Sequence, residues 1–149
     1  MADIADISGT TQVVALIGSP ARHSLSPAIL NAGFAARGLD WRFVVFEVPP
    51  GQGEAAIDAV RTLGIAGLSV TMPHKAAAAA AVDELTPVAE ALGAVNCVFR
   101  SGDRLVGDST DGDGFLDALR LDEGIEVTGR TCAVVGACLL YTSPSPRDS

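Results

Sequence analysis

The sequence contains little cysteine and few aromatic residues. Its 149 residues include three cysteines, one tryptophan and one tyrosine, and aromatic side chains make up 5% of the chain. The cysteines Cys97, Cys132 and Cys138 are odd in number and show no CxxC spacing, so the sequence predicts neither a disulfide framework nor a zinc site. We therefore expect a reducing, cytoplasmic environment and no bound metal.

Long hydrophobic runs are also missing, although apolar residues make up 48% of the chain. The alanine-rich run from Ala76 to Val82 lies between Lys75 and Asp83 and is far shorter than the roughly 20 residues that a membrane span needs. The N-terminal stretch MADIADISGTTQ carries acids and no basic region of the kind that opens a secretory signal. We expect no membrane partner, and we interpret residues 1–11 as an N-terminal tail.

Positive charge is scarce. Lys and Arg number 10 against 18 Asp and Glu, which gives a formal net charge of −8. Because phosphate groups bind to positive surfaces, we expect no nucleic-acid partner. Lys75 is the only lysine in the chain. A surface built on Arg, Asp and Glu does not need a single lysine for solubility, so Lys75 is a candidate functional residue.

Short apolar runs alternate with helical patterns along the chain. The predicted strands are 11–17, 41–48, 67–71, 94–100, 104–106 and 131–135, with SGD as a three-residue turn between the fourth and fifth. The predicted helices are 28–37, 53–63, one beginning at 74, one beginning at 87, and 112–121. This alternation predicts an α/β domain of three layers, with a mostly parallel sheet flanked by helices.

The end of the chain does not follow this pattern. A strand that ends at Gly136 and Ala137 should turn on glycines into a helix, but the sequence continues as CLLYTSPSPRDS, with two prolines and no helical period. We interpret residues 138–149 as a foreign or frame-shifted end. The alternative is a natural, disordered C-terminus.

Two serines follow the first predicted strand. Ser24 and Ser26 precede Pro27 at the start of a predicted helix, where free backbone N–H groups and the helix dipole suit a carboxylate ligand. The alternative is structural, with Ser26 as the N-cap and Ser24 as a turn residue. On these residues alone the structural interpretation is favoured.

Lys75 lies in the first turn of a predicted helix, directly after the third strand. The helix dipole disfavours a cation at this end, and such a placement suits a residue that acts as an acid or base. The alternative is an ordinary surface lysine. We assign no ligand role to His74 or His23, because no spacing of His, Cys and carboxylates forms a metal site.

Two further stretches carry polar residues. Asn96 interrupts a predicted apolar strand, and its amide could satisfy the backbone or bind the hydroxyls of a ligand. Asp108 and Asp111 precede a predicted helix, where acids are ordinary N-caps. Together with Lys75 they could form a pair in which a carboxylate holds the ammonium.

Four stretches, in this order and at this spacing, resemble the shikimate dehydrogenase family: GSPARHSLSPAILNAGF, GLSVTMPHK, GAVNCV and GDSTDGDGF. The resemblance runs from about Val14 to Ala137. It implies a substrate domain followed by a Rossmann domain that holds NADP, and the reduction of 3-dehydroshikimate to shikimate in aromatic amino-acid (chorismate) biosynthesis. Residues 12–121 would then form the substrate domain, and residues 122–137 would begin the Rossmann domain with 131–135 as its first strand.

The resemblance also implies roles for single residues. Ser24 and Ser26 would hold the substrate carboxylate, and Thr71 and Asn96 would hydrogen-bond the ring hydroxyls.

Lys75 and Asp111 would be the catalytic pair at the substrate, moving a proton at its C3 oxygen while hydride arrives from the nicotinamide. Gly136 and Ala137 would begin the loop that binds the cofactor phosphates. Cys138 stands where this glycine-rich loop should continue. We therefore expect the chain by itself neither to bind NADP nor to catalyse the reaction.

A second position, besides Cys138, departs from the family pattern. Ser109 stands where the family usually has Asn, a change that we expect to be tolerated because Thr110 and Asp111 are intact. Two alternatives stay open: a module that only binds shikimate-like carboxylates, and a relative that prefers quinate. The resemblance also allows a homodimer.

Overall fold

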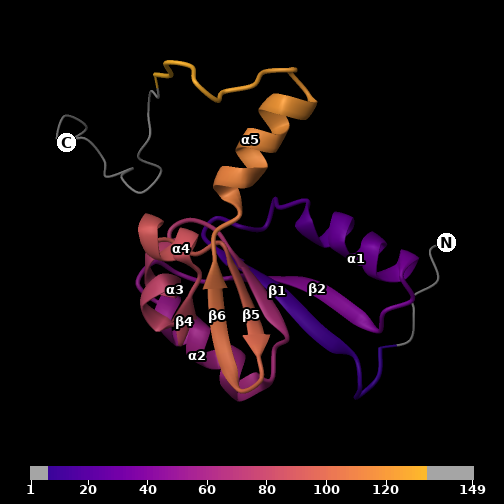
Figure 1. The fold of residues 1–149 in the computed structure, drawn as a ribbon. Coiled ribbons are helices and arrows are strands. Elements are labelled where there is room, and N and C mark those ends of the chain that lie inside the picture. The colour runs from indigo at the N-terminus through magenta and orange to yellow at the C-terminus, as the bar shows by residue number, and fades with distance from the viewer. Residues whose placement is uncertain (1–6, 134–149) are drawn as a thin grey trace, which may run out of the picture. The chain divides into compact units, whose positions relative to one another are not determined.

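The computed structural model describes residues 7–133 of the chain (Figure 1). These residues form two compact units, which divide between Ser109 and Thr110. The first unit contains a six-stranded sheet and four helices, and the second contains one helix followed by irregular chain. We describe each unit by itself.

The sheet of the first unit is mixed. Its order is β2-β1-β3-β5-β6-β4, and three of its five strand pairs are parallel: β1 with β2, β1 with β3, and β4 with β6. The pairs of β3 with β5 and of β5 with β6 are antiparallel. The strands are β1 (Gln12–Gly18), β2 (Trp41–Glu47), β3 (Gly67–Val70), β4 (Glu84–Leu85), β5 (Cys97–Ser101) and β6 (Arg104–Asp108).

Helices cover both faces of this sheet. The helices of the first unit are α1 (Ser26–Ala36), α2 (Gly53–Leu63), α3 (Lys75–Ala81) and α4 (Pro87–Leu92), and the helix of the second is α5 (Asp111–Leu121). Side chains of β1 alternate between two cores, because successive residues of a strand point to opposite faces. Ala15 and Ile17 belong to a core with α2, α3 and α4, whereas Leu16 belongs to a core with Phe43 and α1. The predicted three-layer α/β architecture is confirmed.

The alanine run of α3 allows two helices to pack closely. A Cβ added to Gly53, the first residue of α2, would lie 2.8 Å from the Cβ of Ala77. His74, directly before α3, is 1% exposed, and its Nε2 donates a hydrogen bond of 2.8 Å to the Val48 carbonyl. Small residues on both helices thus bring α3, and Lys75 at its start, against the body of the unit.

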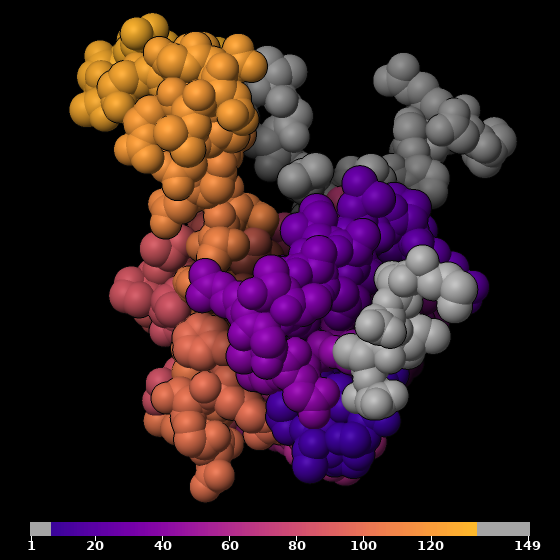
Figure 2. All heavy atoms as spheres, turned by 90° about the vertical axis from the view of Figure 1, so that its right-hand side faces the viewer, coloured from indigo at the N-terminus to yellow at the C-terminus, as the bar shows by residue number. Residues whose placement is uncertain are grey.

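α1 lies at the surface of the first unit (Figure 2, purple). Leu25 and Ile29 on its outer side are 73% and 67% exposed. The helix is held on its inner side by Asn31, whose amide bonds both backbone groups of Phe43: Nδ2 donates to the carbonyl at 2.9 Å, and Oδ1 accepts from the N–H at 2.8 Å. Because β2 is an edge strand, Asn31 takes the place of a neighbouring strand at this residue.

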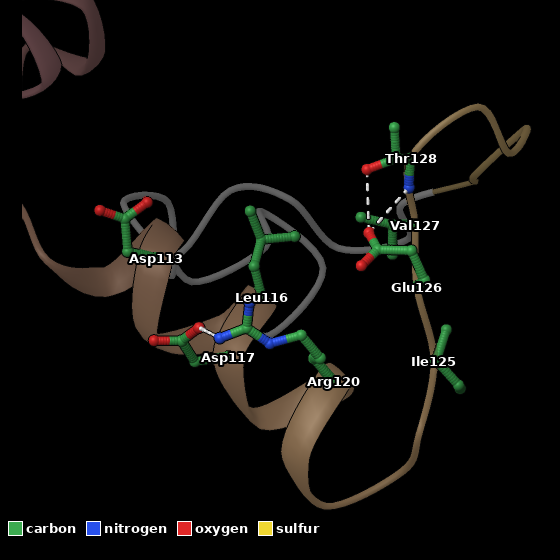
Figure 3. Close-up of a pocket in the computed structure, with 8 residues that line it drawn as sticks. All are labelled: Asp113, Leu116, Asp117, Arg120, Ile125, Glu126, Val127 and Thr128. Atoms are coloured by element: carbon green, nitrogen blue, oxygen red, sulfur yellow. Dashed lines mark hydrogen bonds and ion pairs between the residues drawn. The ribbon is translucent and has the colours of Figure 1, made fainter.

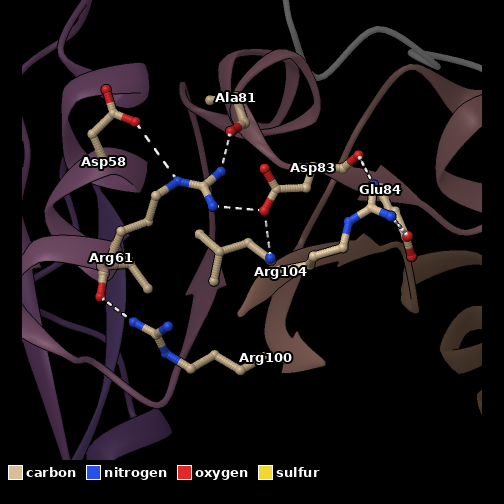
Figure 4. Close-up of polar contacts among 9 residues, drawn as sticks. Asp58, Arg61, Ala81, Asp83, Glu84, Arg100 and Arg104 are labelled. Carbon is tan, nitrogen blue, oxygen red and sulfur yellow. Dashed lines mark hydrogen bonds and ion pairs between the residues drawn. The ribbon is translucent and has the colours of Figure 1, made fainter. Parts of the chain in front are cut away.

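Polar contacts connect α2 to β4 and β6 (Figure 4). Arg61 donates to a carboxylate oxygen of Asp83 at 2.6 Å, and the same oxygen accepts from the backbone N–H of Leu105 at 2.7 Å. The hydrogen bond from Arg61, followed by that from Leu105, lowers the pKa of Asp83 below its usual value. Arg104 forms a further ion pair with Glu84.

Several predicted boundaries were wrong. Ser26 is the first residue of α1 and not its N-cap, which is Leu25 without a side-chain cap. The SGD turn is shorter than predicted, because Ser101 pairs with Arg104 and only two residues connect the strands. The strand predicted as 104–106 extends to Asp108, which ends β6, and β4 was not predicted.

The predicted strand 131–135 was not found over the residues that the structure describes. Residues 131–133 are exposed and have no regular structure. The remainder of that strand, the predicted phosphate-loop residues Gly136 and Ala137, and the tail 138–149 lie outside the described residues. No helix within residues 7–133 is long and apolar enough to cross a membrane.

Candidate functional site

Four strand ends of the first unit meet at one edge of the sheet. Ile17 pairs with Val70, so the parallel strands β1 and β3 end side by side. Cys97, the first residue of β5, pairs with Ser69 of β3 and with Asp108 at the end of β6. The segments that follow β1 and β3, and the residue that precedes β5, therefore share this edge.

A pocket of about 420 Å³ lies at this edge. Three predicted substrate residues, Ser24, Ser26 and Thr71, line it together. The other lining residues are Leu16, Pro20, Ala21, His23 and Met72. The lining therefore combines three hydroxyls with an apolar wall and one imidazole, and it includes no Lys, Arg, Asp or Glu. Hydroxyls can donate to a carboxylate and can both donate to and accept from an alcohol.

The two serines are held by each other and by the backbone. Ser24 Oγ donates to Ser26 Oγ at 3.1 Å and accepts from the Ser26 backbone N–H at 3.2 Å. The Ser24 N–H donates to the Ala21 carbonyl at 3.0 Å. Both side chains are half-buried. This local turn, rather than an N-cap bond, presents a pair of adjacent hydroxyls to the pocket.

Thr71 is fixed by backbone bonds that continue the strand pairing beyond β3. Its N–H donates to the Ile17 carbonyl at 2.9 Å, and the next carbonyl, that of Met72, accepts from the Ser19 N–H at 2.9 Å. Among the described residues its hydroxyl has no hydrogen-bond partner. Thr71 thus brings a hydroxyl to the pocket on a rigid backbone.

Lys75 and Asn96 lie at the same edge but are not among the lining residues. The Val95 N–H donates to the Lys75 carbonyl at 3.0 Å, and the Val70 N–H donates to the Asn96 carbonyl at 2.7 Å. Both residues are half-buried. Asn96 immediately precedes β5 rather than lying within it, so its amide is at the functional edge and not in the middle of a strand.

Asp111 is the first residue of α5 and belongs to the second unit. Its pairing with Lys75 therefore stays a prediction. The other acid considered for this pair, Asp108, is half-buried in the first unit and accepts hydrogen bonds from Thr86 Oγ1 at 2.6 Å and from the Ser109 N–H at 2.8 Å. These contacts give Asp108 a structural role at the end of β6.

The second unit has a pocket of its own, which no sequence pattern predicted (Figure 3). Its volume is about 460 Å³, and its lining residues are Asp113, Leu116, Asp117, Arg120, Ile125, Glu126, Val127 and Thr128. Arg120, the cation in the lining, donates to Asp117 at 2.8 Å. Hydrogen bonds from Thr128 lower the pKa of Glu126. Four of the polar lining residues are thus bonded in two pairs, Arg120 with Asp117 and Thr128 with Glu126.

Metal and thiol chemistry find no support in the described part of the chain. Within it, no group of three or more His, Cys, Asp or Glu residues could hold a metal ion. Cys97 is a half-buried free cysteine, and burial, with a smaller contribution from Asp108, raises the pKa of its thiol. A raised pKa keeps the thiol neutral and makes it a poor nucleophile.

The comparison with known families agrees with this geometry. A family described as "Shikimate dehydrogenase substrate binding domain" matches residues 16–98, which is more than half of the chain. The chain belongs to this family. The matched range of this shikimate dehydrogenase domain includes Ser24, Ser26, Thr71, Lys75 and Asn96, but not Asp111.

Relatives and solved structures extend the similarity. The shikimate dehydrogenase (NADP(+)) of Geobacter metallireducens is 48% identical over 132 residues, which are 89% of this chain and 46% of that protein. A structure of shikimate 5-dehydrogenase from Listeria monocytogenes in complex with shikimate and NAD has a TM-score of 0.77 and 38% identity, covering 83% of this chain and 43% of that one. Shikimate 5-dehydrogenase from Thermus thermophilus in complex with shikimate has a TM-score of 0.72 and 35% identity, covering 80% and 45%. The chain spans less than half the length of these proteins.

Proposed function

We propose that this chain is the substrate-binding part of an NADP-dependent shikimate dehydrogenase. The observation that carries the proposal is the pocket that Ser24, Ser26 and Thr71 line together at the functional edge of a sheet belonging to this family. In this proposal residues 12–121 form the substrate domain and residues 122–137 begin the cofactor domain.

When substrate binds, the Ser24 hydroxyl turns its proton away from Ser26 Oγ, and both hydroxyls donate to the substrate carboxylate. Thr71 and Asn96 hydrogen-bond the ring hydroxyls and thereby fix the orientation of the ring. Neutral hydroxyls can bind a carboxylate well, because a hydrogen bond to a charged acceptor is stronger than a hydrogen bond between two neutral groups.

Lys75 and Asp111 carry the chemistry in this proposal. In the reduction of 3-dehydroshikimate, the Lys75 ammonium gives a proton to the C3 oxygen as the carbonyl becomes an alcohol. Asp111 holds the ammonium in place. In the reverse direction neutral Lys75 takes the hydroxyl proton.

The reduced NADP cofactor would supply the hydride to C3. The described residues of the second unit, 110–133, consist of one helix and irregular chain and form no glycine-rich phosphate loop. The predicted start of that loop, Gly136 and Ala137, lies outside the described residues. We therefore assign no residue of the described chain to the cofactor.

Shikimate binding to the 149-residue chain tests the substrate site. Isothermal titration calorimetry should detect binding, and Ser24→Ala should weaken it roughly ten- to a hundredfold, because a hydrogen bond to a charged group contributes about 1.5–3 kcal/mol. Ser101→Ala, which removes an exposed serine at the far end of β5, is the matched control and should leave the affinity unchanged. Equal affinity of the Ser24→Ala variant would contradict the carboxylate site, and tighter binding of quinate would identify the quinate-preferring relative.

A chimaera tests the reaction. Residues 7–133 of this chain would replace the matching part of the Geobacter metallireducens relative, which supplies the rest of the enzyme. We expect NADPH-dependent reduction of 3-dehydroshikimate. Binding of shikimate without any turnover in a folded chimaera would instead favour a module that only binds such carboxylates.

We also place this function in the cytoplasm. Cys97 and Cys132 are free cysteines, in keeping with a reducing compartment.

A further inference from the structure

β1 ends at Gly18, and the space where a side chain at this position would lie is occupied by Thr71, a residue of the pocket. A Cβ added to Gly18 would lie 2.3 Å from Cγ2 of Thr71 and 3.1 Å from the Met72 carbonyl oxygen. A Cβ atom essentially never lies within 3.0 Å of a non-bonded heavy atom, so the Thr71 methyl occupies the space that a side chain at position 18 would need. The backbone of Gly18 does not have the positive φ that favours glycine. Glycine is therefore needed here for space and not for conformation.

The backbone of Thr71 cannot move away to make room. Its N–H is bonded to the Ile17 carbonyl, and the Met72 carbonyl is bonded to the Ser19 N–H, both at 2.9 Å. These two bonds hold the Thr71 segment on either side of Gly18. The position of the Thr71 side chain is thus decided by rotation about its Cα–Cβ bond.

Rotation about this bond moves the methyl and the hydroxyl together. Both atoms are attached to the same Cβ, and the side chain adopts staggered rotamers. When the methyl lies in the space at Gly18, only one direction remains for the hydroxyl.

We propose that Gly18 is a positioning residue for Thr71: its empty side-chain space holds the Thr71 methyl and so sets the direction of the hydroxyl at the pocket. The inference deepens the proposed function, because it rests on Thr71 as a ligand of the substrate ring. Gly18 itself makes no contact with substrate.

Four proteins test this positioning: the wild-type chain, Gly18→Ala, Thr71→Ser and the double variant. Thr71→Ser removes the methyl that would meet the new Cβ but keeps the hydroxyl. Gly18→Ala should weaken shikimate binding roughly tenfold or more, as expected for loss of one well-aligned hydrogen bond. The double variant should bind within about threefold of Thr71→Ser. Gly33→Ala is the matched control, since a Cβ added there meets nothing within 4 Å, and it should leave binding unchanged.

A second measurement needs no ligand. In protein labelled with ¹³C at the threonine methyls, three-bond couplings from Thr71 Cγ2 to the backbone report its rotamer. They should indicate one rotamer in the wild type and in Gly33→Ala, and a changed or averaged rotamer in Gly18→Ala. Unchanged couplings in folded Gly18→Ala would overturn the positioning role.

The two measurements separate the two proposals. If wild-type protein does not bind shikimate but the couplings respond to Gly18→Ala, the proposed function fails and the positioning of Thr71 stands. If it binds and Gly18→Ala changes neither couplings nor affinity, the positioning role fails and the function stands. If Gly18→Ala does not fold, the double variant should fold again, and its failure to do so would refute the contact with the Thr71 methyl.

Discussion

Asn31 stabilises the fold through two hydrogen bonds, and we expect its replacement to lower the free energy of unfolding. Its amide satisfies both backbone groups of Phe43 on an edge strand, at 2.9 and 2.8 Å. Asn31→Ala removes both hydrogen bonds at once. The free energy of unfolding should fall by about 2–3.5 kcal/mol, because each bond contributes roughly 1 kcal/mol and the backbone groups of Phe43 are left partly unsatisfied. The higher helix propensity of alanine offsets about 0.6 kcal/mol of this lost stability. The net expectation is about 1.5–3 kcal/mol of lost stability.

Guanidinium unfolding followed by circular dichroism measures this loss. The midpoint of Asn31→Ala should fall while the denaturant slope stays the same, since the surface exposed on unfolding hardly changes. Gly33→Ala in the same helix controls for the gain from alanine and should raise the midpoint. Asn31→Asp should lower it, because a carboxylate oxygen would face the Phe43 carbonyl. A midpoint of Asn31→Ala equal to that of Gly33→Ala would refute the argument.

Two further predictions concern catalysis and pH. In the chimaera, Lys75→Ala should lower kcat by about a hundredfold or more while KM changes much less, because the variant loses a general acid. The control variant Arg37→Ala should change neither kcat nor KM. An effect of Lys75→Ala on KM alone would contradict the proton-transfer role. Because the pKa of Asp83 is lowered by Arg61, its contribution to stability should be present above the usual Asp value of about 4 and be lost as the pH falls through the lowered pKa. The difference in unfolding free energy between wild type and Asp83→Asn should therefore shrink below about pH 4; a constant difference would count against the ion pair.

The order of the longer strands and helices could be predicted because most of them carry an apolar spacing of their own, and the alanine run of α3 has a high helix propensity. The helix 53–63 was predicted with the bounds that α2 has, since its apolar spacing ends at Gly64, which adopts a left-handed conformation. β4 could not be predicted, because two residues show no alternation. The start of α1 was misplaced because Ser24, and not Ser26, supplies the side-chain oxygen at that turn.

The topology alone accounts for how three of the predicted site residues come together, while their roles stay a prediction. β1 and β3 are parallel neighbours, so the segments after them had to meet, and Ser24, Ser26 and Thr71 line one pocket. The apolar wall could not be predicted in the same way. Leu16, for example, is indistinguishable in the sequence from other apolar residues of its strand, and only the packing of the loops around it makes it part of a pocket.

The isolated lysine has a structural context that strengthens its assignment. α3 is made of alanines because it packs closely on α2, where even a Cβ at Gly53 would collide with Ala77. A lysine at the start of such a helix, directly after the buried His74, is not explained by surface solubility. Its carbonyl is also bonded to the N–H of Val95, the residue before Asn96, which fixes the start of α3 at the functional edge. The fold thus places the only lysine of the chain at the edge where Thr71 and Asn96 lie, which is the edge that the proposed proton transfer to the C3 oxygen requires.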